Sequence, residues 1–452
     1  MHIAIVGGGL SGLACAKSLV DARHQITLLE SAPFLGGRAS TCRDGDADWI
    51  EQGLQVHLGA YSEVRKLLSE IGREPREVLA WTNEIRFQDL VGPARATFGI
   101  DPLRAAAATL AGIFGNNEYL GPFDKLGVVP LVAPTLHRFD QLRARYDLET
   151  VAGWWARASG NPILMERLLR PLCRALHFTE PEQCSAFALL ELIHHVLKAP
   201  TETHLAGYNG PRDQTIFAPL GRYLTDRGAQ IRTRATVSRI GYEAHRGQQR
   251  ITFVEIGDER IHADVFVAAI PCFALGKLLP PAIANEEPFR RLKQISYCSA
   301  YSVQLWFDCK VVDSTTYTLL ANGVPVAYQD QATTAYPDAR GSRLSVLAPA
   351  TDELKESSDE FLIARVLADL RKVEPEVRPE NVVKSVVLRH DDLVSPTPGT
   401  LSRRLANATP IENFFVAGDW TDQPFFGLQE GAVRSGRACA KAIQEVAARR
   451  AA

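Results

Sequence analysis

Three glycines near the start of the chain are spaced as in a phosphate-binding turn. Residues 7–12 read Gly-Gly-Gly-Leu-Ser-Gly, so Gly7, Gly9 and Gly12 satisfy the pattern G-x-G-x-x-G. In this pattern the first glycine permits a tight turn, the second lets the backbone approach a pyrophosphate, and the third lets a helix pack close to a strand. Glu30 follows the next apolar run and could accept hydrogen bonds from a ribose diol. The pattern predicts a dinucleotide site with contacts from Gly7, Gly9, Leu10, Ser11, Gly12, Glu30 and Ser31.

Two further groups of residues could bind the same ligand. Gly36-Gly37-Arg38 lies in a loop opened by Pro33, where Arg38 could donate charge-assisted hydrogen bonds to a pyrophosphate. Near the other end of the chain, Gly418-Asp419 follows an apolar run, and Glu430-Gly431-Ala432 begins a helical pattern. The free N–H groups at such a helix start favour a ligand atom on which negative charge collects.

Strands and helices in a fixed order are needed to position these residues. Apolar runs predict strands at 2–6 and 25–29, and apolar residues at helical spacing between them predict a helix after the glycine turn. A further buried strand is predicted at 414–417, followed by an amphipathic helix over 432–446. A strand, a glycine turn, a helix and a second strand that ends in an acidic residue form the context that a dinucleotide turn requires.

Together, the glycine turn, Glu30 and Gly36-Gly37-Arg38 resemble the FAD-binding N-terminus of the amine-oxidase and carotenoid-desaturase flavoprotein superfamily. Gly418-Asp419 and Glu430-Gly431-Ala432 resemble the segments that hold the ribityl chain and face the flavin ring in the same superfamily. The resemblance implies that FAD is the cofactor. It also implies an α/β fold, in which a Rossmann-like FAD-binding domain of the GR2 type is interleaved with a mixed α+β substrate domain.

The same resemblance implies further cofactor contacts and a discontinuous domain. Val237 would meet the adenine, Ala269 would lie at the floor of the flavin, and Gly53 and Leu54 would belong to a flavin-side loop. The FAD domain is expected at 1–75, 210–280 and 385–452, and the substrate domain at 76–209 and 281–384. Within the substrate domain, helical composition is expected over 102–115, 161–177 and 187–197, and alternation predicts a strand at 301–307.

One branch of the superfamily is similar over most of the chain. The flavin-side loop Gln52–His57, with Gly59-Ala60-Tyr61, resembles that of plant- and cyanobacterial-type phytoene and zeta-carotene desaturases. The sequence Gly-Asp-Trp-Thr-Asp at 418–422 also resembles squalene-associated flavoproteins, including hydroxysqualene dehydroxylases. The resemblance implies an FAD-dependent oxidoreductase that transfers hydride between flavin and a hydrophobic isoprenoid, with a quinone or another partner exchanging electrons with the flavin.

The residue type at position 428 distinguishes between two classes of substrate. Amine oxidases of this superfamily carry an aromatic residue two positions before the glutamate of Glu-Gly-Ala, whereas this chain has Leu428, which suits a lipid better than an amine. Phe425, Phe426 and His57 are further candidates for the substrate wall, and no catalytic acid or base is assigned. Three alternatives remain open: reductive chemistry of the hydroxysqualene dehydroxylase type, amine oxidation, and a non-catalytic flavin-binding partner.

Composition excludes several classes of protein. Among 452 residues, 46% are hydrophobic and 23% charged, and the net charge of −2 argues against a nucleic-acid partner. The eight cysteines form no C-x-x-C pair, and no metal site is expected. The first residues lack the basic region of a signal peptide, and no apolar run is long enough to cross a bilayer. A cytoplasmic protein is expected, with a peripheral membrane contact through the apolar stretch 98–132.

Overall fold

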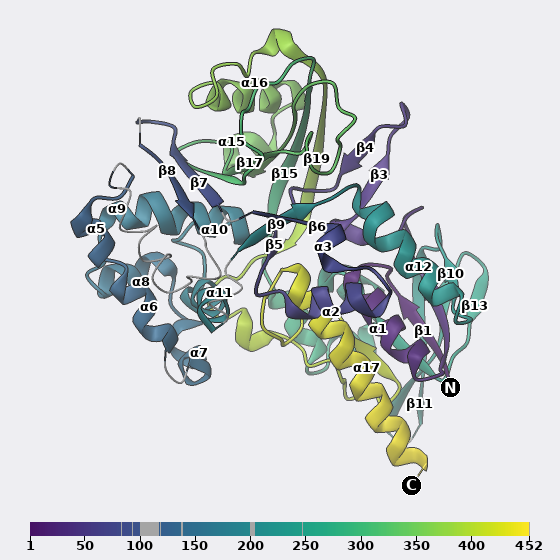
Figure 1. Ribbon diagram of the computed structural model, residues 1–452. Coiled ribbons are helices and arrows are strands. Elements are labelled where there is room, and N and C mark those ends of the chain that lie inside the picture. Colours follow the sequence, from purple (N-terminus) through teal and green to yellow (C-terminus); the bar gives the residue numbers. More distant parts are fainter. Residues whose placement is uncertain are drawn as a thin grey trace.

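A five-stranded parallel sheet forms the base of the molecule in the computed structural model, which describes residues 1–82, 84–92, 94–99, 117, 119–136, 139–198, 204–245 and 247–451. Its strand order is β10-β2-β1-β14-β20 (Figure 1). The strands are β1 (His2–Val6), β2 (Gln25–Leu29), β10 (Gln230–Arg232), β14 (Val265–Ala268) and β20 (Phe414–Val416). Three distant parts of the chain therefore build one sheet.

Helices cover this sheet because its strands are apolar on both faces. Ile3, Ala4 and Ile5 of β1 have no exposed surface, as expected for a parallel strand between two layers. Three helices pack in a row beside the sheet, with α1 (Leu10–Asp21) in contact with both α12 (Ala218–Thr225) and α17 (Gln429–Ala451). An antiparallel sheet of β11 (Val237–His245), β12 (Gln248–Ile256) and β13 (Glu259–Ile261) completes this half, together with α13 (Cys272–Leu278) and α14 (Pro281–Ala284).

A seven-stranded mixed sheet dominates the other half, with the order β19-β15-β18-β17-β16-β7-β8. Its strands are β7 (Glu84–Asp89), β8 (Arg95–Gly99), β15 (Tyr297–Phe307), β16 (Thr318–Ala321), β17 (Ala327–Asp330), β18 (Arg343–Pro349) and β19 (Val382–Val394). Helices α15 (Asp352–Lys355) and α16 (Asp359–Leu370) lie over it at the top of Figure 1. Their apolar residues share a core with the strands, in which Val303, Leu344 and Leu362 are fully buried.

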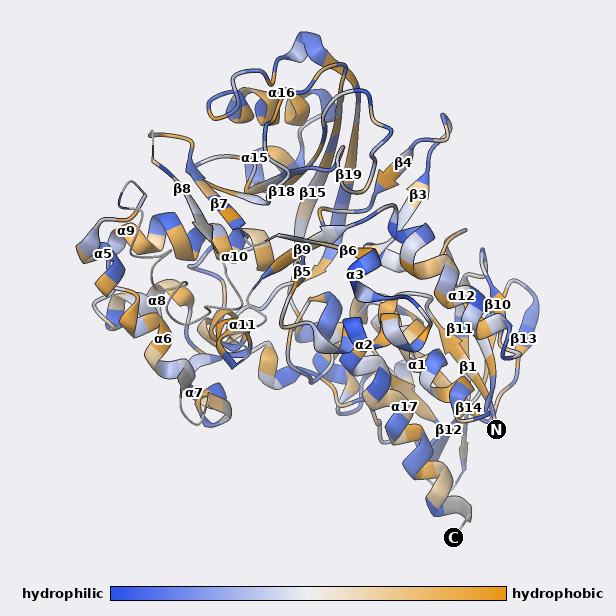
Figure 2. Cartoon of the chain, in the orientation of Figure 1, coloured by the Kyte–Doolittle hydropathy of each residue, from blue (hydrophilic) through white to orange (hydrophobic). Residues whose placement is uncertain are grey.

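A group of helices flanks the seven-stranded sheet at the left of Figure 1. These helices are α5 (Pro122–Leu126), α6 (Val129–Leu136), α7 (Arg143–Tyr146), α8 (Val151–Arg157), α9 (Pro162–Leu164), α10 (Arg170–His177) and α11 (Ala186–Lys198). Among them, α11 is rich in apolar residues, as Figure 2 shows, and is buried over most of its length. No helix in the described ranges is long and apolar enough to cross a membrane.

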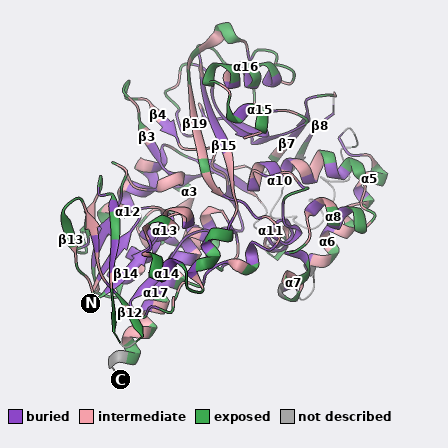
Figure 3. Cartoon of the chain, turned by 180° about the vertical axis from the view of Figure 1, so that it is seen from behind, coloured by how far each residue is buried: buried purple, intermediate pink, exposed green. Residues whose placement is uncertain are grey.

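Short elements connect the two halves. They are the hairpin β3 (Thr41–Arg43) and β4 (Trp49–Glu51), the small sheet of β5 (His57–Leu58), β9 (Leu205–Tyr208) and β6 (Leu79–Thr82), and the helices α2 (Ser62–Glu70) and α3 (Pro75–Val78). Seen from behind, the buried residues follow both sheets and continue into α10 and α11 (Figure 3). The halves therefore meet over a continuous interior.

Most of the expected elements are present. Val237, expected to meet the adenine, begins β11, which pairs in the antiparallel sheet, while β10 takes the edge of the parallel sheet. The segment 265–270 contributes β14, which lies next to β1 inside that sheet. The helix expected over 102–115 lies outside the described residues, as does most of the first half of the stretch 98–132.

Candidate active site

A cavity of about 820 Å³ lies between the parallel sheet, the seven-stranded sheet and helices α10 and α11. One part is lined by the carboxyl ends of β1 and β2 and by the loops that follow them, where ligands bind in folds with open parallel sheets. Sixteen of the residues singled out from the sequence line the cavity: Gly7, Gly9, Leu10, Ser11, Glu30, Ser31, Gly36, Gly37, Arg38, Leu54, Val237, Ala269, Gly418, Asp419, Leu428 and Ala432.

The glycine turn has the geometry that its spacing predicts. Gly7 adopts φ +110°, and a Cβ there would lie 2.3 Å from the carbonyl oxygen of Ala269. A Cβ on Gly12 would lie 2.0 Å from the carbonyl oxygen of Gly7, which shows how closely α1 approaches the turn. A Cβ on Gly9, in contrast, would meet no atom within 4 Å and would enter the cavity. Gly9 thus leaves space for a ligand, whereas Gly7 and Gly12 allow the backbone to pack.

The Glu30 carboxylate lies at the end of β2 and holds the loops around it. Its oxygens accept hydrogen bonds from the backbone N–H groups of Gly8 and Ala32, both at 2.7 Å. The Ser31 hydroxyl also donates to this carboxylate, at 3.1 Å. Glu30 is buried and borders the cavity, so its oxygens are in place to meet a ribose as well.

Arg38 joins the two distant ends of the chain. Its guanidinium forms an ion pair of 2.7 Å with Asp419, although the two residues are far apart in sequence. Burial acts to lower the pKa of Arg38, but the carboxylates of Asp419 and Asp392 outweigh it, so the pKa is raised and the charge is retained. A fixed positive charge beside the glycine turn suits the pyrophosphate of a dinucleotide.

Glu430 stabilises helix α2. Its carboxylate has no exposed surface and accepts hydrogen bonds from the backbone N–H groups of Glu63 and Val64, at 3.0 and 3.1 Å. Arg434 forms an ion pair with it at 2.8 Å. The Glu430 side chain therefore caps α2, because a helix N-terminus attracts an acidic group.

Three other expected cofactor residues have supporting positions. Gly12 packs within the turn, and the Gly53 carbonyl accepts a hydrogen bond from Arg212 at 3.3 Å. A Cβ on Gly431 would lie 2.3 Å from the carbonyl oxygen of Phe425, so this glycine permits a close approach of two backbone segments. None of the three is among the residues that line the cavity.

The second part of the cavity is apolar. Its walls come from α10, α11, the seven-stranded sheet and the flavin-side loop, through Leu54, Val56, Leu58, Ile85, Leu172, Leu176, Leu189, Leu192, Ile193, Val196, Leu197, Leu205, Leu319 and Leu347. Leu428 borders this part, as the sequence predicts. Such walls accept a hydrocarbon chain and provide no partner for a charged group.

His57, Phe425 and Phe426, which were expected to line the substrate wall, are buried and are not among the residues that line the cavity. His57 lies between the rings of Tyr61 and Trp81, at 5.2 and 5.5 Å. Burial, together with Arg65 and His204, lowers the pKa of His57 to about 3 and keeps the ring neutral. Phe425 packs against Tyr61 and His195, and Phe426 lies under the guanidinium of Arg404.

The sequence patterns did not indicate a cluster of polar side chains in the wall of the cavity. Gln55, Gln429 and Tyr317 line the cavity there. The Gln429 amide donates to Gln55 Oε1 at 2.5 Å and accepts from the hydroxyl of Tyr208 at 2.7 Å. The Tyr317 hydroxyl donates to the Gln55 carbonyl at 2.5 Å. These contacts join four segments, and no local sequence pattern indicates them.

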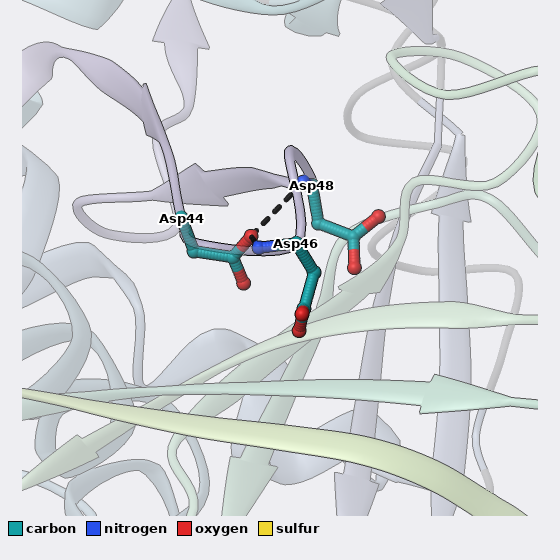
Figure 4. A group of neighbouring side chains, drawn as sticks. All are labelled: Asp44, Asp46 and Asp48. Atoms are coloured by element: carbon teal, nitrogen blue, oxygen red, sulfur yellow. Dashed lines mark hydrogen bonds between the residues drawn. The ribbon is translucent and has the colours of Figure 1, made fainter.

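A group of three aspartates lies away from the cavity, in the turn between β3 and β4. Asp44, Asp46 and Asp48 converge, and the backbone N–H groups of Asp46 and Asp48 donate to the Asp44 carboxylate (Figure 4). The ammonium group of Lys384, on β19, lies within 2.6 to 2.8 Å of all three carboxylates. Lys384 therefore supplies the positive charge that such a group attracts.

Comparison with known proteins agrees with this architecture. The sequence pattern of the family described as flavin containing amine oxidoreductase matches residues 10–444. The chain belongs to the flavin-containing amine oxidoreductase family. Its cofactor is FAD, and it is an FAD-dependent oxidoreductase.

Relatives of this flavin-containing amine oxidoreductase include carotenoid desaturases. The chain is 28% identical to a 15-cis-phytoene desaturase of Synechococcus elongatus, over 98% of this chain and 96% of the relative. It is 29% identical to a probable zeta-carotene desaturase of the same organism, over 99% of both chains. The crystallised cyclohexylamine oxidase of Brevibacterium oxydans shares the fold, with a TM-score of 0.69 at 18% identity over 98% of each chain.

The residues of the cavity fit FAD. The space beside Gly9 is open, Arg38 supplies positive charge, and Glu30 borders the adjoining surface. The first turn of α17, which Gln429 and Ala432 place against the cavity, presents free N–H groups to the same space. This family member thus has a polar channel for a dinucleotide and an apolar chamber that continues from it.

Proposed function

We propose that this enzyme transfers hydride between FAD and a hydrophobic isoprenoid, such as phytoene, zeta-carotene or a squalene-type lipid. The observation that carries the proposal is the apolar chamber, whose leucine, isoleucine and valine walls from α10, α11 and the seven-stranded sheet continue directly from the polar channel. The similarity to phytoene and zeta-carotene desaturases over nearly the whole chain supports the same substrate class.

The residues of the chain hold and orient the reactants. Arg38 and the glycine turn would hold the pyrophosphate, and Glu30 would bind the ribose. The N-terminus of α17 would place its positive dipole end at the ring, where negative charge collects on reduction. The leucines of α10 and α11 exclude water and align the chain of the substrate.

Bound FAD supplies the two-electron chemistry. In the oxidative direction a substrate carbon would give up a hydride to the flavin and the neighbouring carbon would give up a proton to solvent, so that a double bond forms between them. The two electrons would then pass to a quinone, which takes up two protons to become the quinol, or to another acceptor. In the reverse direction an external donor supplies the electrons, as in hydroxysqualene dehydroxylation, which the Gly-Asp-Trp-Thr-Asp sequence at 418–422 favours as the second candidate.

A water-insoluble substrate has to be collected from a bilayer, and one surface suits peripheral contact with it. Phe123, Leu126 and Val129 are 87%, 61% and 64% exposed on α5 and α6. Helix α6 packs against α11, whose residues Val196 and Leu197 line the apolar chamber. We include in the proposal that this surface contacts lipid near the entrance of the chamber.

The proposal is tested by anaerobic reduction of the flavin. The FAD-loaded enzyme is mixed with phytoene, zeta-carotene, hydroxysqualene and a panel of amines, and the flavin absorbance is followed. We expect at least one isoprenoid to bleach the oxidised flavin, or hydroxysqualene to reoxidise the reduced flavin. Bleaching by an amine, without a response to any isoprenoid, would overturn the proposal in favour of amine oxidation.

A further inference from the structure

One hydroxyl in the lining of the cavity has no hydrogen-bond partner among the residues that the structure describes. Tyr61 is 2% exposed and lines the cavity, yet its hydroxyl makes no hydrogen bond to any residue that the structure describes. Its ring is fixed edge-on by His57 and Phe425, at 5.2 and 5.7 Å. A ligand that displaces water from this part of the cavity would have to supply a partner for the hydroxyl, so the position is suited to a ligand that carries an acceptor.

The side-chain amide of Gln429 supplies another unused donor in the lining of the same cavity. One of its N–H groups donates to Gln55, while its oxygen accepts from Tyr208, and this pair of contacts fixes the orientation of the amide. An amide nitrogen carries two N–H donors, so one remains without an acceptor among the described residues. Tyr208 is buried, and burial raises the pKa of its hydroxyl to about 12, so it stays protonated and continues to donate.

The backbone keeps Tyr61 and Gln429 close to each other. Tyr61 directly precedes α2, and the first N–H groups of α2 bind the carboxylate of Glu430, the residue next to Gln429. The lining of the same cavity includes many hydrocarbon side chains, among them Val56, Leu58 and Leu205. Tyr61 and Gln429 both line the cavity, so two spare donors are available to a ligand that occupies it.

We propose that the Tyr61 hydroxyl and the spare N–H of Gln429 bind an oxygen atom carried by an otherwise apolar ligand. The inference rests on the proposed function and makes it more specific. At least one ligand of the cavity would carry an oxygen acceptor, which a pure hydrocarbon lacks. The oxygen belongs either to a hydroxyl or carbonyl group of the isoprenoid substrate or to the carbonyl of a quinone that exchanges electrons with the flavin. Both sources present the same chemistry to the two donors.

The substrate source is tested by binding a matched pair of probes to the FAD-loaded enzyme. Geranylgeraniol and the hydrocarbon of the same carbon skeleton are titrated while the flavin spectrum is recorded. We expect the native enzyme to bind the alcohol about tenfold more tightly, the effect of one or two buried hydrogen bonds. Tyr61→Phe should abolish this preference and leave the affinity for the hydrocarbon unchanged. Because the hydroxyl has no protein partner, this substitution removes no internal contact.

The quinone source is tested by reoxidation of the reduced enzyme. A short-chain ubiquinone and ferricyanide, which accepts electrons without an oxygen contact of this kind, are compared under anaerobic conditions. If the oxygen belongs to the acceptor, Tyr61→Phe should slow reoxidation by the quinone about tenfold and leave the ferricyanide rate unchanged. Gln429→Leu should change the affinity for the alcohol or the rate with quinone in the same direction as Tyr61→Phe, in whichever of the two experiments Tyr61→Phe has an effect.

Tyr301→Phe is the matched control, because the Tyr301 hydroxyl donates to the Leu354 carbonyl and Tyr301 is not among the residues of the cavity. This substitution should change neither the preference for the alcohol nor the rate of reoxidation by quinone. The inference is overturned if Tyr61→Phe keeps the native preference for the alcohol and the native rate with quinone. If neither isoprenoid perturbs the flavin while amines bleach it, the proposed function fails, and the quinone arm alone still decides the role of Tyr61.

Discussion

Gly9 and Gly12 belong to one turn but serve different purposes. Gly12 lies against the carbonyl oxygen of Gly7, whereas a side chain on Gly9 would enter open space. The backbone at Gly9 is extended, with φ −74°, and any residue can adopt this conformation. The two positions therefore separate cofactor binding from folding.

We predict that Gly9→Val abolishes FAD binding without unfolding the protein. The valine would occupy the space of the pyrophosphate, and FAD affinity should fall at least about hundredfold. Gly12→Ala should instead lower the free energy of unfolding by about 1–3 kcal/mol, because its Cβ overlaps backbone atoms. The ratio of flavin to protein absorbance and the denaturant unfolding of both variants, stripped of FAD, measure the two effects. Stoichiometric FAD in Gly9→Val would contradict the assignment.

At the residue scale, the sequence predicts the cofactor contacts better than the substrate contacts. Gly7, Gly9, Glu30 and Arg38 follow a short local pattern imposed by the pyrophosphate and ribose, and all of them line the cavity. Tyr61 and the amides of Gln55 and Gln429 come from separate segments. Their roles depend on tertiary contacts, which residue type and spacing do not show.

At the scale of elements, Glu430 joins the first turn of α17 to the first turn of α2. Two backbone N–H groups of α2 that would otherwise lack partners bind its carboxylate. Burial raises the pKa of Glu430, although these N–H groups and Arg434 act in the opposite direction. The position of α2, and of Tyr61 before it, therefore depends on α17.

We predict that Glu430→Gln lowers the free energy of unfolding by about 1.5–3 kcal/mol, because a charged acceptor is lost from a buried site. Amide hydrogen exchange should accelerate in the first turn of α2. Glu445→Gln, in the exposed pair with Lys441 on the same helix, serves as the control and should change stability by less than about 0.5 kcal/mol. Equal effects of the two substitutions would show that the cap has no special role.

The sequence predicts long buried strands and amphipathic helices more reliably than short strands at the edge of a sheet. β1, β2 and β20 are apolar and were expected where they occur, as was the core of β15. β10 spans only Gln230–Arg232, and its first residue is exposed, so hydrophobic patterning gives little signal for it. Its position at the edge is determined by pairing with β2.

At the scale of the whole molecule, Lys384 links the β3–β4 hairpin to the seven-stranded sheet through ion pairs. The three aspartates of the β3–β4 turn surround its ammonium group, which belongs to the far edge strand of the seven-stranded sheet. The same aspartates lie close enough to hold a cation by themselves (Figure 4). The lysine thus offsets the repulsion among the three carboxylates of this turn.

We predict that Lys384→Gln weakens the attachment of the hairpin and makes stability depend on calcium. Removal of the ammonium leaves three converging carboxylates, which suit a hard cation. Calcium at about five times its Kd should then stabilise the variant by about 1 kcal/mol, whereas the native protein should not respond. Thermal unfolding with and without calcium measures this difference, and a calcium response in the native protein would contradict it.

Helix α17 and strand β20 have a consequence for biosynthesis. The wall of the FAD channel that contains Gly418, Asp419 and Ala432 is translated after almost everything else described above. A nascent chain that has not yet reached β20 and α17 therefore exposes the edge of β14 that pairs with β20, and the face of α1 that packs against α17 is uncovered. Formation of the complete FAD channel has to follow synthesis of α17, so flavin supply and chaperone protection of α1 would both bear on the yield of active enzyme.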